Sequence, residues 1–378
     1  MIMKTSKTAI LSTRLFKVII ILFSLFPNIF YPQEDSVNES DLELFPIVNY
    51  DSDAGFGYGA KAFLFNQLKM NESFDLILYN STKGERWYRF VFSIMDMQRR
   101  QGKEYPLALD LIIDYDKWIN YRYYGVEYFY ERDSLTNYEV YTREPFEISS
   151  ILSKGFTKTF VASMGLKYKT ISSYNFSING ELINTDNDFN NRFIKTLSIL
   201  GTIRWDSRNN FINPDKGTVF QMDADYAPKI SFNNEDYLKL GLTFQNYLTL
   251  FDPQIVFASR LVGQIIFPDN VPIQLQLPIG GNNTLRGLPQ DRYLSASTLI
   301  INNEIRFPIW WRFGGIAGLD VGCTGSTTDY EFWNPQLSGW IVNPVLGLRF
   351  YMDNFIVRFD VGFGNEITGV YFNFGHIF

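Results

Sequence analysis

An alternation of apolar and polar side chains runs through most of the chain and constrains its fold more than any other feature. In the segment 355–363 every second residue is apolar, while Arg358 and Asp360 lie on the opposite face. A period of two residues is typical of a β-strand with one apolar and one polar face. The segments 107–115 and 220–226 show the same alternation. The chain is therefore predicted to consist mainly of amphipathic strands.

Amphipathic strands build both soluble sandwiches, whose apolar faces form a core, and transmembrane barrels, whose apolar faces meet lipid. Three features favour the barrel. The expected strands have about ten residues, no segment has the pattern of a long amphipathic helix, and aromatic pairs such as Trp87–Tyr88 and Trp310–Trp311 occur near strand ends. Aromatic residues at strand ends are typical of the girdles at membrane interfaces. The predicted fold class is an all-β, transmembrane antiparallel β-barrel.

The pattern predicts about sixteen strands, an even number, as a barrel made from one bacterial chain requires. The expected strands cover residues 54–66, 72–82, 86–98, 106–116, 121–131, 143–154, 158–174, 193–206, 216–229, 235–249, 254–267, 296–309, 313–323, 339–352, 353–363 and 367–378. Short turns, such as 153–158, alternate with longer loops, such as 268–295. Long loops are expected on the external side, which places the glycine-rich segment 280–291 in the sixth external loop.

The first 33 residues are predicted to be a cleaved signal peptide. Four basic residues precede an apolar run at 18–26, which is the arrangement of a secretory signal. A membrane anchor is the alternative, but the run is well short of the roughly 20 residues that a spanning helix needs. A short periplasmic lead segment, 34–44, and an outer-membrane barrel, 45–378, complete the expected organisation.

Composition argues against several classes of function. The net charge is −6 and no basic run is present, so a nucleic-acid partner is not expected. The chain has one cysteine, Cys323, and one histidine, His376. A disulfide within the chain and a Cys/His zinc site are therefore excluded, and a Ser-His-Asp triad would depend on His376. No enzyme activity, metal or cofactor is expected.

Motifs along the second half of the chain resemble those of the BamA/TamA outer-membrane assembly superfamily, the bacterial surface antigen type of barrel, which also includes the two-partner-secretion transporters. The matching residues are Arg286, Gly287 and Leu288 in the sixth loop, Asn302, Glu304, Arg306 and Pro308 in the following strand, and Leu319, Asp320 and Gly322 in the next. Leu288 and Leu319 replace aromatic residues of the family. Further similar segments are 53–60, 123–128, 204–217 and 369–378.

The resemblance implies that Arg286 lies inside the barrel, because in this family the tip of the sixth loop folds back into the lumen. Alternation turns Glu304 and Asp320 inward on neighbouring strands. Two carboxylates in a water-poor lumen would repel each other, whereas one guanidinium between them can bind both. We therefore expect a lumenal latch formed by Arg286, Gly287, Glu304 and Asp320 and supported by Asn302, Arg306 and Gly322. The alternative is that these residues only stabilise the fold.

The last residues resemble the closing strand of the family, which the assembly machinery recognises as a targeting signal. The resemblance assigns Phe372, Phe374 and Phe378 to this C-terminal targeting strand. The barrel of family members usually follows soluble POTRA domains that capture client proteins. Only residues 34–54 lie between the expected cleavage site and the first expected strand, which is too short for one such domain, so a barrel without POTRA domains is expected.

The resemblance implies a protein of the outer membrane of a Gram-negative bacterium that assists the insertion or translocation of other proteins. The expected partners are outer-membrane lipid and either unfolded outer-membrane proteins or a periplasmic protein that supplies the POTRA function. Two alternatives stay open. One is a passive, porin-like channel narrowed by the folded-in loop. The other is a lipase-type or protease-type enzyme, although no suitable Ser or Asp constellation is found in the sequence.

Overall fold

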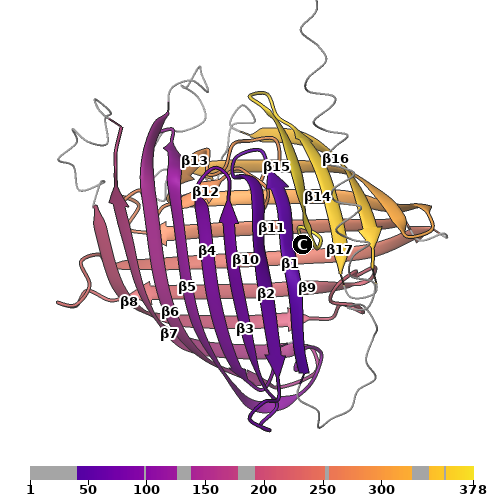
Figure 1. Cartoon of the computed structure of the whole chain (residues 1–378), viewed down its shortest axis with the longest axis horizontal. Coiled ribbons are helices and arrows are strands. Elements are labelled where there is room, and N and C mark those ends of the chain that lie inside the picture. Colours follow the sequence, from indigo (N-terminus) through magenta and orange to yellow (C-terminus); the bar gives the residue numbers. More distant parts are fainter. Residues whose placement is uncertain are drawn as a thin grey trace, which may run out of the picture. The chain divides into compact units, whose positions relative to one another are not determined.

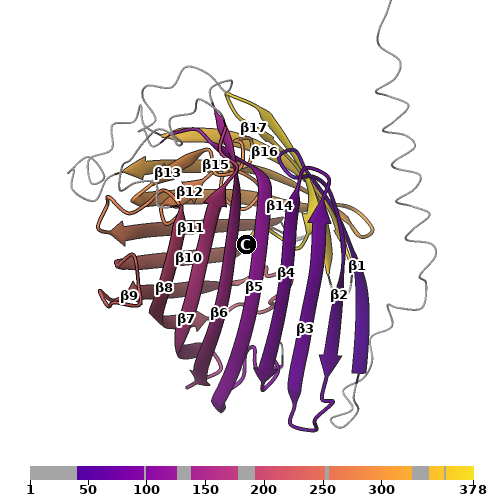
Figure 2. The same ribbon diagram turned by 60° about the vertical axis from the view of Figure 1, so that its left-hand side comes forward.

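The computed structural model describes residues 41–97, 99–125, 138–177, 192–251, 255–325, 340–352 and 355–378. In this part of the chain, sixteen antiparallel strands form a closed barrel, and two short strands form a separate hairpin (Figure 1). Figure 2 shows the long strands β3 to β8 side by side along one wall. None of the described residues forms a helix of the length and apolar character needed to cross a membrane. The expected signal peptide, 1–33, lies outside the described residues.

The barrel strands follow one another around the wall in chain order. They are β1 (Asp41–Asp51), β2 (Gly55–Phe65), β3 (Glu72–Ser81), β4 (Glu85–Ile94), β5 (Tyr105–Tyr123), β6 (Glu139–Gly155), β7 (Phe160–Tyr174), β8 (Phe193–Asp206), β9 (Gly217–Ala227), β10 (Tyr237–Phe251), β11 (Ile255–Phe267), β14 (Ser297–Trp310), β15 (Phe313–Gly325), β16 (Ile341–Tyr351), β17 (Ile356–Phe363) and β18 (Thr368–Phe374). The hairpin strands β12 (Leu277–Ile279) and β13 (Tyr293–Ser295) lie in the long loop between β11 and β14. That loop is the sixth on its side of the barrel, as predicted.

The two faces of the wall differ in the way the alternation predicted. On β17, Arg358 and Asp360 point inward and are buried, whereas Phe359 and Phe363 are 39 % and 43 % exposed on the outer surface. Leu111 and Ile113 on β5 and Leu346 on β16 are also exposed. So many large apolar side chains on one surface are typical of a wall that faces lipid.

The strand count was predicted correctly, but some assignments were wrong. Residues 121–123, which were expected to begin a separate strand at 121–131, are instead the end of the long β5, and residues 126–131 lie outside the described residues. The strand β1 was missed, since its first residues were assigned to a lead segment ending at residue 44. Proline lacks the backbone N–H that a strand interior uses, so Pro46 disfavoured this assignment. Proline is tolerated at a sheet edge, and β1 has such an edge.

That edge is the seam where the barrel closes. Between β1 and β18 the register pairs only Tyr50 with Phe372 and Asp51 with Tyr371. On their other sides, β1 pairs with β2 from Asp41 to Asp51, and β18 pairs with β17 along its whole length. The seam therefore lies between β1 and β18, rather than between the first and last expected strands, 54–66 and 367–378.

Candidate functional site

The tip of the long loop, residues 286–287, packs against the inner face of β17 so closely that the two backbones are in contact. Gly287 has φ of +91°, a conformation that favours glycine. A Cβ atom on Gly287 would lie 2.7 Å from the backbone nitrogen of Gly364, and one on Gly362 would lie 2.4 Å from the carbonyl carbon of Arg286. Glycine on both sides thus allows a contact that any side chain would block.

Arg286 lies at the centre of this contact and is fully buried. Its Nε and Nη2 atoms donate to the two carboxylate oxygens of Asp320, both at 2.9 Å. Its Nη1 atom donates to Glu304 at 2.9 Å and to Asp360 at 2.8 Å. The structure therefore brings together the predicted residues Arg286, Glu304 and Asp320. It adds Asp360, which the sequence analysis placed on an inward face but not at this site.

Three further guanidinium groups surround the carboxylates. Arg306 donates to Glu304 at 3.0 Å, and Arg349 donates to Asp360 at 2.5 Å. Arg358 lies 3.6 Å from Asp360. We call Arg286, Arg306, Arg349, Arg358, Glu304, Asp320 and Asp360 the arginine cluster; it holds four cations and three carboxylates, all at most 3 % exposed. Buried ions require such mutual pairing, because each loses its hydration.

Neutral residues orient the cluster and the loop tip. The Asn302 amide donates to Asp320 and to the carbonyl oxygen of Thr284, both at 2.8 Å. Asn343, which the sequence analysis missed, donates to the carbonyl oxygen of Arg286 at 2.9 Å. Gly322 lies beneath Leu285, since a Cβ atom there would be 2.8 Å from the leucine side chain. All three predicted supporting residues, Asn302, Arg306 and Gly322, thus contact either the loop or the cluster.

Apolar packing holds the loop on the other side of the tip. Leu285 and Leu288 form a buried group with Ile279 of β12 and Ile300 of β14. Leu288, which replaces an aromatic residue of the family motif, is 2 % exposed. Leucine at this position is therefore buried in the apolar group.

The loop also contacts residues on both sides of the seam. On the β1 side, the backbone N–H of Gln290 donates to Asp53 at 2.8 Å. On the β18 side, Arg292 binds Glu366 through two hydrogen bonds of 2.7 Å and 2.8 Å, and the N–H of Gly287 donates to Tyr371 at 3.2 Å. Only two residue pairs join β1 to β18 directly. The loop segment 287–292 connects the two sides of this seam a second time.

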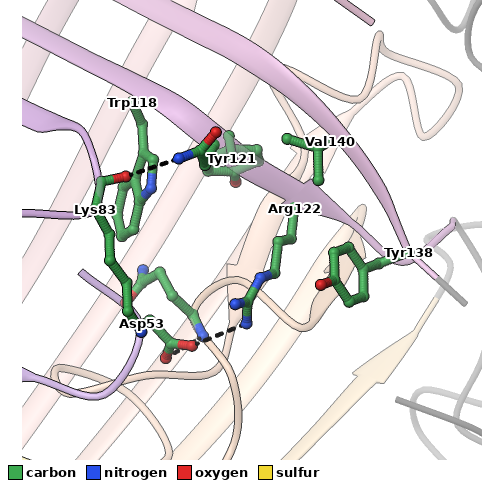
Figure 3. Close-up of a pocket in the computed structure, with 9 residues that line it drawn as sticks. Asp53, Lys83, Trp118, Tyr121, Arg122, Tyr138 and Val140 are labelled. Atoms are coloured by element: carbon green, nitrogen blue, oxygen red, sulfur yellow. Dashed lines mark hydrogen bonds and ion pairs between the residues drawn. The ribbon is translucent and has the colours of Figure 1, made fainter. Parts of the chain in front are cut away.

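A cavity of about 260 Å³ lies beside the β1 contact, between the ends of the strands. Figure 3 shows Asp53 and Tyr138 on either side of Arg122. Asp53 and Arg122 form a salt bridge of 3.4 Å. Nearby, the Tyr121 hydroxyl donates to Asp291 at 2.6 Å. Burial raises the pKa of the Asp53 and Asp291 carboxyl groups above the usual range. The hydrogen bonds from Gln290 to Asp53 and from Tyr121 to Asp291 act in the opposite direction and lower these pKa values.

The C-terminal residues depart from the prediction. Phe372 and Phe374 lie on β18, but the strand ends at Phe374. Phe378 is therefore not part of a closing strand. Its ring lies 6.4 Å from the ring of Tyr247 on β10, and the guanidinium of Arg306 lies 5.1 Å from it. The targeting role of these phenylalanines stays a prediction.

The described residues contain no group of His, Cys, Asp and Glu side chains that could hold a metal ion. The loop tip is held by the ion pairs of Arg286 with three carboxylates, by hydrogen bonds from Asn302 and Asn343, and by apolar packing. Such an arrangement can position a loop and can be disrupted by competing charges or by movement of a strand.

Most of the chain is similar to known proteins. The model of the Omp85 superfamily domain matches residues 67–378. Among solved structures, BamA from Haemophilus ducreyi lacking POTRA domains 1–3 is similar, with a TM-score of 0.63 and 14 % identity over 90 % of this chain and 70 % of that one. No curated protein matches in sequence.

Two CdiB structures are also similar. CdiB from Acinetobacter baumannii has a TM-score of 0.56 and 14 % identity over 89 % of this chain and 66 % of that one. CdiB from Escherichia coli has a TM-score of 0.60 and 12 % identity over 92 % of this chain and 63 % of that one. The chain thus spans less than two thirds of either CdiB chain, and the likeness is one of fold.

Proposed function

The chain belongs to the Omp85 superfamily of outer-membrane barrels, as its motifs predicted, and we propose that it assists the insertion or translocation of other proteins at the outer membrane of a Gram-negative bacterium. In this proposal β1 and β18 part, and the freed edge of β1 pairs with an incoming strand. The observation that supports it is the seam, which has two residue pairs.

The energetics favour opening at this seam over any other strand pair. A backbone hydrogen bond contributes about 0.5–1.5 kcal/mol net in water, and more where no water can replace it. Two residue pairs join β1 to β18, whereas seven join β17 to β18 and eleven join β1 to β2. Separation therefore costs least at the seam.

An open seam would also bind a strand. Free N–H and C=O groups of a sheet edge are costly in lipid, so an extended segment of another protein that pairs with them lowers the free energy of the open state. Among the described residues, β18 pairs with only the last two residues of β1. The stretch 44–49 of β1 is the edge that such a client strand would use.

The contacts of Arg286 give the long loop its role in this proposal. The loop tip is bound to β14, β15 and β17 through the arginine cluster, and residues 287–292 contact both sides of the seam. We infer that the loop is a latch that holds the lumenal side of the wall in place while the seam opens. A fixed inner support would let β1 and β18 move without collapse of the barrel.

The test is an insertion assay in which a disulfide bond can hold β1 and β18 together. The barrel is folded into liposomes, an unfolded outer-membrane protein is added, and its folding is timed by gel shift against empty liposomes. The Tyr50→Cys/Phe372→Cys variant places a disulfide across the seam at paired positions. The matched control, Leu78→Cys/Tyr88→Cys, places one at paired positions of β3 and β4, away from the seam.

We expect the wild type to accelerate folding of the client. The seam disulfide should abolish the acceleration until a reductant is added, and the control disulfide should leave it intact. Acceleration that survives the seam disulfide would refute lateral opening. If the wild type gives no acceleration but a steady ion conductance that rises in Arg286→Ala, the protein is instead a passive channel narrowed by its loop.

A further inference from the structure

The cavity of about 260 Å³ beside Asp53 lies at the end of the barrel from which the sixth loop leaves the strands. It is lined by the turns that follow β1 and β3, the last residues of β5, the start of β6 and the loop residue Gln290. This end is expected to face the exterior. Pockets for drug-sized ligands have about 300–1,000 Å³, so this cavity suits a ligand of about one ring.

Two cations line the cavity, and neither is fully paired. The Arg122 side chain is 36 % exposed, and its salt bridge to Asp53 is 3.4 Å long. A charge-assisted hydrogen bond between a guanidinium and a carboxylate is shorter, at about 2.7–2.9 Å. The ammonium group of Lys83 donates to the carbonyl oxygen of Ser52, and Lys83 forms no salt bridge with any of the described residues. Both cations therefore keep donors for an added anion.

The carboxylates nearby do not offset these cations. Asp53 is the one carboxylate of the lining, and its side chain is 8 % exposed. Its two oxygens accept from Arg122 and from the backbone N–H of Gln290. Asp291 is also bonded through both oxygens, by the Tyr121 hydroxyl and the Gln290 amide, each at 2.6 Å. The lining thus has two cations for one carboxylate.

Aromatic rings accompany the cations. In the view of Figure 3, Trp118 lies to the left of Arg122 and Tyr138 to its right. The Arg122 guanidinium lies 5.0 Å from the centre of the Tyr138 ring, and Tyr138 is 40 % exposed. Trp118 is held edge-on against Tyr121, with the ring centres 6.0 Å apart. Such rings present a large and rigid apolar surface, against which the C–H face of a sugar ring can pack.

We propose that the cavity is a binding site for an acidic sugar, that is, a sugar ring with a carboxylate or phosphate group. Arg122 and Lys83 bind the anionic group, and Trp118 and Tyr138 contact the ring. The exposed side chain of Asn120 supplies an amide oxygen that accepts from a sugar hydroxyl. A lipid-linked saccharide and a free saccharide share this chemistry. The site does not depend on the proposed insertion activity.

Occupation of the cavity should also affect the long loop. Gln290 lines the cavity and donates its backbone N–H to Asp53. A ligand between Gln290 and Arg122 on β5 therefore joins the loop to the wall, and a bound ligand stabilises the state that binds it. Amide hydrogen exchange in residues 287–292 should thus be slower when the ligand is present.

The first experiment measures sugar binding to the full chain, refolded in phosphatidylcholine vesicles, by saturation-transfer NMR. The probes are glucuronate, glucose 6-phosphate, neutral glucose and acetate. Both acidic sugars should bind. Glucose lacks the anionic group and acetate lacks the ring, so each should bind about tenfold more weakly than glucuronate.

Variants locate the binding within the protein. Lys83→Met and Arg122→Met each remove one cation and should weaken glucuronate binding about tenfold. Lys229→Met is the matched control, because Lys229 is an exposed lysine in the loop between β9 and β10 and does not line the cavity. Val140→Trp fills the cavity but keeps both cations, and it should abolish binding. A gel shift confirms that each variant is folded.

Glucuronate binding that persists in Val140→Trp and in both cation variants would overturn the proposed site. Equal binding of glucose or of acetate would overturn its assignment to acidic sugars. Vesicles that contain lipopolysaccharide then distinguish the two sources. Loss of glucuronate binding in these vesicles means that a lipid-linked saccharide occupies the cavity, and unchanged binding means that the ligand is a free saccharide. None of these measurements involves a client protein, so the site and the insertion activity can fail separately.

Discussion

Replacement of Arg286 by alanine tests the arginine cluster most directly. It removes four side-chain hydrogen bonds, two to Asp320 and one each to Glu304 and Asp360. The three carboxylates are not affected equally. Glu304 keeps Arg306 and Asp360 keeps Arg349. Asp320 has no other salt bridge among the described residues and keeps only the amide donors of Asn302 and of residue 286.

The expected cost follows from that imbalance. Removal of one partner of a buried ion pair costs about 3–5 kcal/mol, because the other charge stays buried without compensation. We expect Arg286→Ala to lower the free energy of unfolding by this amount. Asp320→Asn in the Arg286→Ala background removes the uncompensated charge and keeps an acceptor, so about 2 kcal/mol should be regained. Arg286→Lys should fall between alanine and the wild type, because an ammonium group cannot bind both oxygens of Asp320 in a two-pronged way.

The assay is guanidinium unfolding in phospholipid vesicles, followed by tryptophan fluorescence and extrapolated linearly to zero denaturant. Lys61→Ala is the control, because it breaks an inward ion pair with Asp75 whose side chains are 32 % and 23 % exposed. Such a pair should contribute about 0–1 kcal/mol. The reasoning is refuted if Arg286→Ala costs no more than Lys61→Ala, or if Asp320→Asn adds its full cost to that of Arg286→Ala.

Two further predictions concern the loop. Gly362→Ala should expel the loop tip, since the new Cβ atom would lie 2.4 Å from the carbonyl carbon of Arg286. Protease cleavage within 268–296 should then appear. The control Gly201→Ala should show no such cleavage, because a Cβ atom there would have no neighbour within 4 Å. Arg292→Ala removes both hydrogen bonds to Glu366 and should speed amide hydrogen exchange in residues 364–374 several-fold. Unchanged exchange there would mean that the loop does not support the seam.

Local alternation predicted the faces of the strands, and with them part of the cluster. Glu304 and Asp320 turn inward because the side-chain period of a strand is two, and both contact Arg286. Asp360 follows the same rule, but its contact with Arg286 depends on how the closed wall brings β17 to the loop tip. Such a contact is fixed by closure and strand tilt, which no local pattern encodes. Arg349 and Asn343 were missed for the same reason.

Residues 375–378, which follow β18 and are called the tail, show where alternation misleads. Their sequence continues the pattern of β18, so 367–378 was predicted as one strand. Two physical features outweigh the pattern. Gly375 allows a sharp change of direction, and the lumen contains guanidinium groups whose donors exceed the local carboxylate acceptors. Main-chain oxygens of residues 377 and 378 supply acceptors that the wall itself does not.

That excess of donors also connects the loop, the tail and the seam. The cluster has four guanidinium groups for three carboxylates, and Arg306 and Arg358 each retain buried N–H groups without partners among the described residues. A buried donor without an acceptor is costly, so each acceptor that arrives lowers the free energy of the cluster. The tail is attached to β18 and brings two acceptors to the cluster, a main-chain oxygen of Phe378 to Arg306 and Nδ1 of His376 to Arg349. Movement of β18 away from β1 would pull on these acceptors, and Arg306 and Arg349 also hold Glu304 and Asp360. The state of the seam is therefore linked to the loop through shared arginines rather than through contact of the loop with the strand edge alone.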